Sequence, residues 1–216
     1  MPSNDATPMI NRRTFLATAA AATAILSTPS AGRADDIPAA AAEFVSKLAD
    51  RVIVILKDKS LDKDGRVKAL AAVFLDGFDV RAIGLFVLGV YGHKLTDSER
   101  VAYLDVFKEY VVQTYAVRFN SYAGQSFVVT KNAPDGDTGA WVTTGIGKPG
   151  EEPTEVQWRV RKEGNVYKII DVVVEGVSLL VTQRSEFAAV LQRNNGNITS
   201  LTALMRDKIV ELRQKS

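Results

Sequence analysis

The spacing of apolar residues along the chain changes from a helical to an alternating pattern and then back again. Between about residues 39 and 121, apolar side chains recur every three or four positions, which is typical of amphipathic helices. After Gly124 they alternate with polar residues, which is typical of half-buried strands. This order predicts an α+β fold in which a four-stranded antiparallel sheet packs against several helices.

The N-terminal half is expected to be helical throughout. Thr96 and Glu99 have the spacing of a capping box, so the longest helix should begin there. The segment 79–92 is apolar on nearly every side, and it must therefore be enclosed by protein or line an apolar space. The predicted helices cover residues 39–57, 63–77, 79–92 and 96–121.

Four strands joined by turns follow, and two helices close the chain. In the third strand Val156, Trp158 and Val160 should face inward, because polar or charged residues alternate with them. The strands are expected near residues 127–130, 140–147, 156–162 and 166–174. The final helices are expected over 182–193, with Thr182 as the cap, and over 198–212.

The segment Asp171–Phe187 (DVVVEGVSLLVTQRSEF) joins the last strand to the next helix through an interruption at Glu175-Gly176. Its first valines suit a strand. Glu175 lies in the interruption, and Arg184 lies in the helix expected after it. They could fix the bend as a charged pair, present a docking surface, or contact a ligand headgroup.

Residues 1–34 have the layout of a secretory signal. Arg12-Arg13 precedes Phe15-Leu16, and an alanine-rich uncharged run extends to Gly32. The arginine pair resembles a twin-arginine signal. The densest apolar part, 15–26, is well short of the roughly 20 residues that a membrane span needs. Cleavage is therefore expected after Ala34, which leaves residues 35–216 as one domain.

The charge of the remaining chain excludes some partners. The whole chain has 27 basic and 25 acidic residues, and the signal holds three of the arginines and one aspartate. The mature domain is therefore close to neutral, which disfavours nucleic acid and permanent attachment to anionic membranes. The chain has no cysteine, so neither disulfides nor thiolate chemistry is available.

The sequence contains no pattern typical of a catalytic or metal site. His93 is the one histidine, and we expect it at the surface or packed in a loop, with no metal role. Asp135-Gly136-Asp137 lacks the later glutamate of a calcium loop and is expected to be a hairpin turn. A small enzyme of the isomerase or dehydratase type, using Asp171 and Glu175, is the least favoured alternative.

Several segments together resemble the MlaC (toluene tolerance) family over about residues 39–212. Gln157-Trp158-Arg159-Val160, Tyr167-Lys168-Ile169 with Asp171-Val172, and Val174-Glu175-Gly176-Val177 with Arg184-Ser185-Glu186-Phe187 occur in the family's order and spacing. The segments Leu88-Gly89-x-Tyr91 and Leu95-Thr96-x-x-Glu99-Arg100 are similar to the family's turn before the long helix.

This resemblance implies a periplasmic phospholipid-binding protein, with no catalytic residues and no cofactor other than the bound phospholipid. It also implies shuttling of lipid between an outer-membrane lipoprotein complex and an inner-membrane MCE-domain ABC transporter complex, which would maintain outer-membrane lipid asymmetry. Membrane contact would be transient. A hopanoid or another polycyclic lipid remains an alternative cargo.

An apolar cavity between sheet and helices is expected to hold the acyl tails, although the same residues could instead interdigitate into a solid core. The expected lipid-binding residues are apolar side chains on the inner faces of these elements. They are Phe74, Phe78, Phe86, Leu88, Tyr103, Phe107, Tyr110, Trp158, Ile169, Val172, Val174 and Val177.

Overall fold

A computed structural model describes residues 36–119, 124–148 and 150–215, and the predicted signal at 1–34 lies outside this part. Residues from Asp35 onward form one compact unit. Among the helices described, none is both long enough and apolar enough to cross a bilayer.

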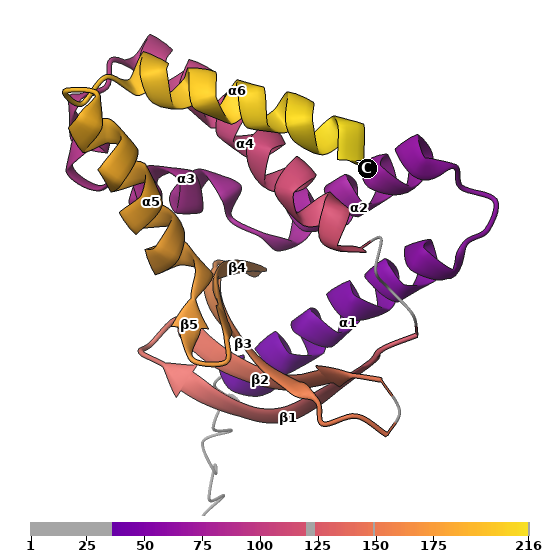
Figure 1. Cartoon of the computed structure of the whole chain (residues 1–216). Coiled ribbons are helices and arrows are strands. Elements are labelled where there is room, and N and C mark those ends of the chain that lie inside the picture. The colour runs from indigo at the N-terminus through magenta and orange to yellow at the C-terminus, as the bar shows by residue number, and fades with distance from the viewer. Residues whose placement is uncertain (1–35, 120–123, 149, 216) are drawn as a thin grey trace, which may run out of the picture. The chain divides into compact units, whose positions relative to one another are not determined.

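The unit begins with a run of helices, as predicted, and Figure 1 shows them in chain order. Three of these helices begin at an aspartate whose carboxylate accepts a backbone N–H three residues further on, which satisfies a donor that the helix leaves free. The elements are α1 (Ile37–Lys57), α2 (Lys63–Gly77), α3 (Val80–Leu88), the 3-10 helix η1 (Gly89–Lys94) and α4 (Asp97–Phe119).

The capping box before α4 is confirmed. Glu99 accepts hydrogen bonds from the backbone N–H of Thr96 at 2.9 Å and from its hydroxyl at 2.7 Å. The backbone N–H of Glu99 in turn donates to the Thr96 hydroxyl at 3.3 Å. This reciprocal bonding fixes the start of α4.

The strands form a single antiparallel sheet in the order β1-β2-β3-β4-β5, so the predicted α+β class is confirmed. The predicted number of strands was wrong by one, because a two-residue fifth strand pairs with the end of β4. The strands are β1 (Ser126–Asp135), β2 (Gly139–Gly147), β3 (Thr154–Glu163), β4 (Val166–Val174) and β5 (Val177–Ser178).

Strand β4 contains a bulge that changes which of its side chains face the helices. Arg159 lies opposite Asp171 and Val160 lies opposite Ile169, so Ile170 is an extra residue. Val172 and Val174 consequently share the face of Ile169, whereas Asp171 is placed on the face of Arg159.

A two-residue hairpin turn joins β4 to β5, and α5 (Leu179–Arg193) follows β5 directly. Glu175 and Gly176 have φ values of 49° and 81°, as a turn that matches the twist of two antiparallel strands requires. The prediction that α5 begins at Thr182 was wrong. Ser178 is the cap, and its hydroxyl oxygen accepts the Val181 N–H at 3.0 Å.

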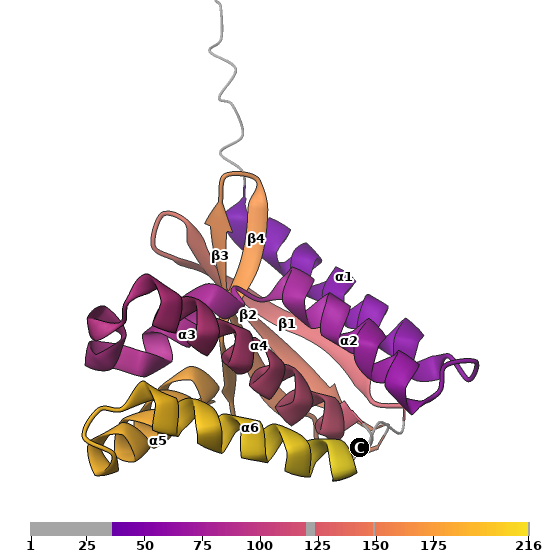
Figure 2. The same ribbon diagram turned by 90° about the horizontal axis from the view of Figure 1, so that it is seen from above.

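The apolar side chains pack into two separate clusters. The sheet cluster joins α1 and α2 to the sheet through residues such as Val45, Val142 and Ile169. The helical cluster joins α3, α4, α5 and α6 (Ile198–Lys215) through Tyr103, Phe107 and others. Figure 2 shows α4 beside α6, and α4 also contacts α2, which packs against α1.

Candidate functional site

A cavity of about 490 Å³ lies between the two clusters and receives side chains from all of α1–α5 and from strands β1–β4. Its volume is in the range of roughly 300–1,000 Å³ that is usual for small-molecule sites. Val45 and Ile169 belong to the sheet cluster, and Phe107 and Val111 belong to the helical cluster, yet all four line it. The cavity is therefore the space that the two clusters leave between them.

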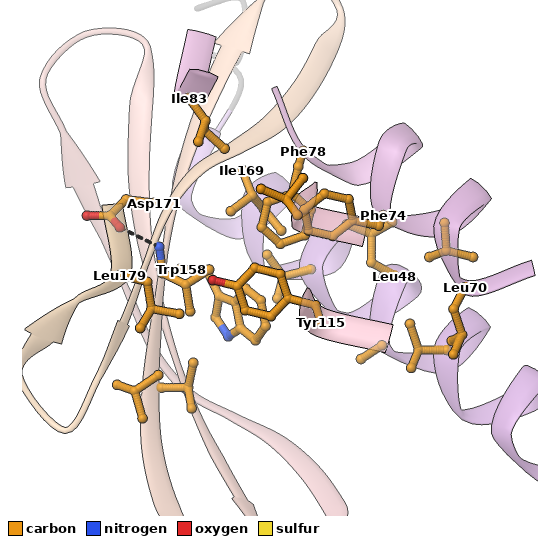
Figure 3. A pocket seen from close by; sticks show the side chains of 18 of the residues that line it. Leu48, Leu70, Phe74, Phe78, Ile83, Tyr115, Trp158, Ile169, Asp171 and Leu179 are labelled. Carbon is orange, nitrogen blue, oxygen red and sulfur yellow. Dashed lines mark hydrogen bonds between the residues drawn. The ribbon is translucent and has the colours of Figure 1, made fainter. Parts of the chain in front are cut away.

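The wall of the cavity is almost entirely hydrocarbon. Side chains of Leu, Ile, Val and aromatic residues provide most of it, and Figure 3 shows these residues around the space. Among the described residues that line it there is no lysine, arginine or histidine. The polar residues on the wall are Gln125, Ser126, Asp171 and Gln183, together with the Tyr115 hydroxyl and the Trp158 indole N–H.

Asp171 is the one carboxylate on this wall, and hydrogen bonds within the fold occupy it. It is 8% exposed. One oxygen accepts the N–H of Val172 at 2.7 Å and of Leu180 at 3.2 Å, and the other accepts the Ser178 hydroxyl at 2.8 Å. In Figure 3 the carboxylate points away from Trp158 and Tyr115. Asp171 thus ties the end of β4 to the first turn of α5.

Arg159 lies on the same face of the sheet as Asp171, outside the cavity. Its guanidinium pairs with the Asp135 carboxylate, and this hydrogen bond raises the pKa of Arg159, with a smaller contribution from the charge of Asp171. The same guanidinium lies 5.5 Å from the ring centroid of Trp141. The Arg159 guanidinium is therefore held outside the cavity by Asp135 and Trp141.

Trp158 is held in the wall by a hydrogen bond from its side chain. The indole N–H donates to the Thr144 hydroxyl oxygen at 2.9 Å, and this hydroxyl donates to the backbone oxygen of Val156 at 3.1 Å. Thr144 is fully buried. Because each polar group in this short chain has a partner, the indole can lie against an apolar space without an unpaired donor.

Seven of the twelve residues expected to bind lipid line the cavity. The inward prediction for Trp158 agrees with the register of the sheet, and the bulge at Ile170 is what allows Ile169, Val172 and Val174 to share one face. The seven residues are Phe74, Phe78, Phe107, Trp158, Ile169, Val172 and Val174.

The structure places the other five residues elsewhere. Leu88 and Tyr103 are buried inside the helical cluster, where the Tyr103 hydroxyl donates to the Gly84 carbonyl at 2.9 Å and burial raises its pKa. Tyr110 packs against Phe187, with a ring-centroid separation of 6.1 Å. Phe86 and Val177 are 42% and 57% exposed. On a helix, a stripe of apolar residues has the same spacing whether it packs solidly or lines a space.

The residues expected to bind lipid included none from the first helix, although α1 supplies six of the residues that line the cavity. Its stripe was recognised as apolar, but its position along the sheet depends on contacts that no local pattern contains. Leu179 and Leu180 were also left out, since α5 was expected to begin after them. The lining residues of α1 are Val45, Leu48, Ala49, Val52, Ile53 and Leu56.

The residues considered for metal binding or for a charged pair do not come together in one site. His93 is exposed, as expected, and Asp135-Gly136-Asp137 forms the turn between β1 and β2. Within the described ranges no three His, Cys, Asp or Glu side chains gather as metal ligands. Among the same residues no ion pair joins Glu175 to Arg184, so the interpretation of a charged pair at the bend is wrong. The Arg184 guanidinium instead lies 4.7 Å from the Phe86 ring centroid.

The family model described as "MlaC protein" matches residues 46–207. This chain belongs to the MlaC family. The match covers most of the compact unit, including every strand and the start of α6, so the resemblance found in the sequence is confirmed.

The fold of this MlaC-family chain is also found among solved structures. It is the phospholipid-binding protein from Ralstonia solanacearum in complex with a phospholipid, with a TM-score of 0.71 and 23% identity. The superposition covers 80% of this chain and 98% of that one. At this identity the likeness establishes the fold.

The role of Asp171 can be tested by replacing it and, as a control, by replacing Glu175 in the turn that follows β4. Asp171→Ala removes the acceptor of three hydrogen bonds and should lower the free energy of unfolding by about 2–3 kcal/mol. The matched change Glu175→Ala, at an exposed site, should alter it by less than about 0.5 kcal/mol. Urea unfolding followed by circular dichroism measures both, and equal stabilities of the two variants would contradict the role given to Asp171.

Proposed function

We propose that this protein is a carrier of phospholipid that holds acyl tails in the cavity and leaves the headgroup near solvent. The observation that carries the proposal is the hydrocarbon wall built from nine elements of one fold. The bound phospholipid in the Ralstonia solanacearum protein supports it, because that protein has the same fold.

The energetics of a lipid carrier favour a deep and apolar site. A carrier has to match what a bilayer provides, which is roughly 0.8 kcal/mol per buried methylene, or about 12 kcal/mol for a tail of some fifteen methylenes. A shallow surface groove cannot bury that much chain. A cavity whose walls come from both sheet and helices can do so.

The absence of basic side chains from the described part of the wall supports acyl tails as the part that is enclosed. A buried phosphate or ammonium group would need a charged or multiply hydrogen-bonded partner. The described wall offers amides and hydroxyls, from Gln125, Ser126 and Gln183, and one carboxylate already engaged by three donors. The headgroup is therefore assigned to the solvent side.

The two alternatives from the sequence are less well supported by the geometry. An isomerase or dehydratase would need a free acid on the cavity wall, whereas the Asp171 carboxylate bonds to the first turn of α5. Glu175 is exposed on a turn. A polycyclic lipid such as a hopanoid would fit the same hydrocarbon chemistry, and it differs from a phospholipid in mass and rigidity.

The place of action that we propose is the periplasm, reached after cleavage of the twin-arginine signal following Ala34. There the protein would carry lipid between an outer-membrane lipoprotein complex and an inner-membrane MCE-domain ABC transporter complex. Membership of the MlaC family supports this assignment.

Bound lipid is the most direct test of the proposal. Residues 35–216, purified from a bacterial host without detergent and extracted with organic solvent, should release phospholipid in an approximately equimolar amount. Mass spectrometry distinguishes a phospholipid from a polycyclic lipid. A protein that releases no lipid and takes none from labelled vesicles would refute the proposal.

A large side chain that projects into the cavity should strongly reduce lipid binding while the protein stays folded. Val172→Trp projects a large ring into the space from β4 and should lower retained lipid by about tenfold or more. The control is Val128→Trp, because Val128 is 54% exposed on β1 and is not on the cavity wall. Equal lipid retention by the two variants, measured by the same extraction, would argue against the cavity as the site.

The export route predicts a defined N-terminus. Full-length protein recovered from the periplasmic fraction of a Gram-negative host should begin at Asp35 by intact mass. Replacing Arg12 and Arg13 together by lysine should block its appearance there. Arg33→Lys is the control and should not change export. Normal export of the double variant would exclude the twin-arginine route.

A further inference from the structure

Helices α3 and α5 carry exposed apolar side chains outside the cavity. Figures 1 and 2 both show α3 beside α5, and the two helices are in contact. Phe86 of α3, Val90 of η1 and Val181 of α5 are 42%, 67% and 54% exposed. We call these three residues, together with Arg184, the α3–α5 patch. Exposed apolar side chains that gather in one place are typical of an interaction surface.

Arg184 lies at the centre of the α3–α5 patch. Its guanidinium is 4.7 Å from the Phe86 ring centroid, a cation–π contact that joins α5 to α3. Gly89, which has a φ of 54° and precedes Val90, leaves room for it, because a Cβ there would lie 3.2 Å from a guanidinium nitrogen. Val181 lies one turn before Arg184 on α5. The three apolar side chains are therefore arranged around one cation.

The charge of Arg184 is available to an external anion. Its side chain is exposed, and no carboxylate within the described ranges pairs with it. The elements that carry the patch are basic. Residues 80–94 and 179–193 contain four lysines and arginines and one acidic residue, Glu186, although the mature domain as a whole is close to neutral. This local excess of positive charge is complementary to an anionic surface.

A single layer of helix separates the α3–α5 patch from the cavity. Ile83 and Val87 line the cavity from α3, whereas Phe86 of the same helix is exposed and is not on the cavity wall. In the same way Leu180 lines the cavity from α5, whereas Val181, the next residue, is exposed. A surface bound to the patch would therefore lie about 10 Å from the cavity, which is the diameter of a helix.

We propose that the α3–α5 patch docks the protein reversibly on an anionic bilayer, with its apolar side chains inserted at the interface and Arg184 at the level of the lipid phosphates. This inference goes beyond the carriage of lipid and does not depend on what the cavity holds. Apolar and aromatic side chains beside a cation are typical of segments that bind at a membrane surface.

The size of the patch favours a membrane over a protein as its occupant. A stable protein interface takes roughly 20–30 residues from each side, whereas the α3–α5 patch consists of four side chains. Because so few side chains insert and the mature domain is close to neutral, the contact is weak and the protein can leave the bilayer again.

Sedimentation with vesicles tests the docking. Residues 35–216 are mixed at low ionic strength with vesicles of equimolar phosphatidylglycerol and phosphatidylcholine, and the protein in the pellet gives the partition coefficient. The wild type should bind these vesicles more strongly than vesicles of phosphatidylcholine alone. Phe86→Ser should lower the partition coefficient at least about fivefold, because an inserted ring is lost. Arg184→Gln should lower it about fivefold on the anionic vesicles only.

An exposed valine and an exposed arginine elsewhere on the surface provide matched controls. Val54 of α1 is 68% exposed, and Arg206 of α6 is also exposed. Val54→Ser and Arg206→Gln should leave the partition coefficient at the wild-type value. Arg184→Lys keeps the charge and should retain most of the binding to anionic vesicles. The melting temperature of each variant, measured alongside, separates a loss of folding from a loss of docking.

The outcomes for docking and for lipid carriage are read separately. Lipid extracted from the protein before vesicles are added reports on carriage, whereas the pellet reports on docking. A wild type that stays in the supernatant overturns the docking proposal and leaves a protein partner as the occupant of the patch. A folded Phe86→Ser variant that partitions like the wild type also overturns it. If Phe86→Ser does not fold, Val90→Ser and Val181→Ser decide, and wild-type partitioning of both overturns the proposal.

Discussion

The division of the apolar side chains into two clusters is the constraint on which the cavity depends. Protein interiors normally close to crystal-like density, so a single cluster of this size would leave no room for a ligand. Here the helical cluster is complete around Tyr103 and Phe107, and the sheet cluster is complete around Val142 and Ile169. The residues of both clusters line the space between them.

Polar contacts at two chain connections hold the clusters at this separation. At the first, between α2 and α3, the N–H of Asp79 donates to the Ile169 carbonyl at 3.0 Å and Arg161 pairs with the Asp79 carboxylate at 2.8 Å. At the second, between β4 and α5, Asp171 binds the Ser178 hydroxyl and the Leu180 N–H. Hydrogen bonds have a fixed length and direction, so they set a spacing that apolar packing alone would not.

Much of the fold could be predicted from the sequence, because its signals are local. The capping box at Thr96 and Glu99, the turns of the sheet and the α+β order all depend on neighbouring residues. The start of α5 was mispredicted, since Ser178 and Thr182 are both good caps, and Ser178, which also bonds to Asp171, is the one used.

The cavity could be predicted only in part, for the same physical reason. Trp158 and Val172 lie on strands, where alternation assigns a face, and both line it. Leu88 and Tyr103 lie on helices with apolar stripes, and whether a stripe meets a neighbour or a space is decided by tertiary packing. The bulge at Ile170 has no local signal, yet it determines the face of every later residue of β4.

The cavity wall draws on residues from Val45 to Gln183, which places most of the compact unit in contact with one space. No short segment of the chain can form this wall, so the site requires contacts between distant parts of the sequence. A ligand held there touches both clusters at once. It should therefore couple them and raise the cooperativity of unfolding, so that empty protein loses one cluster before the other whereas filled protein loses both together.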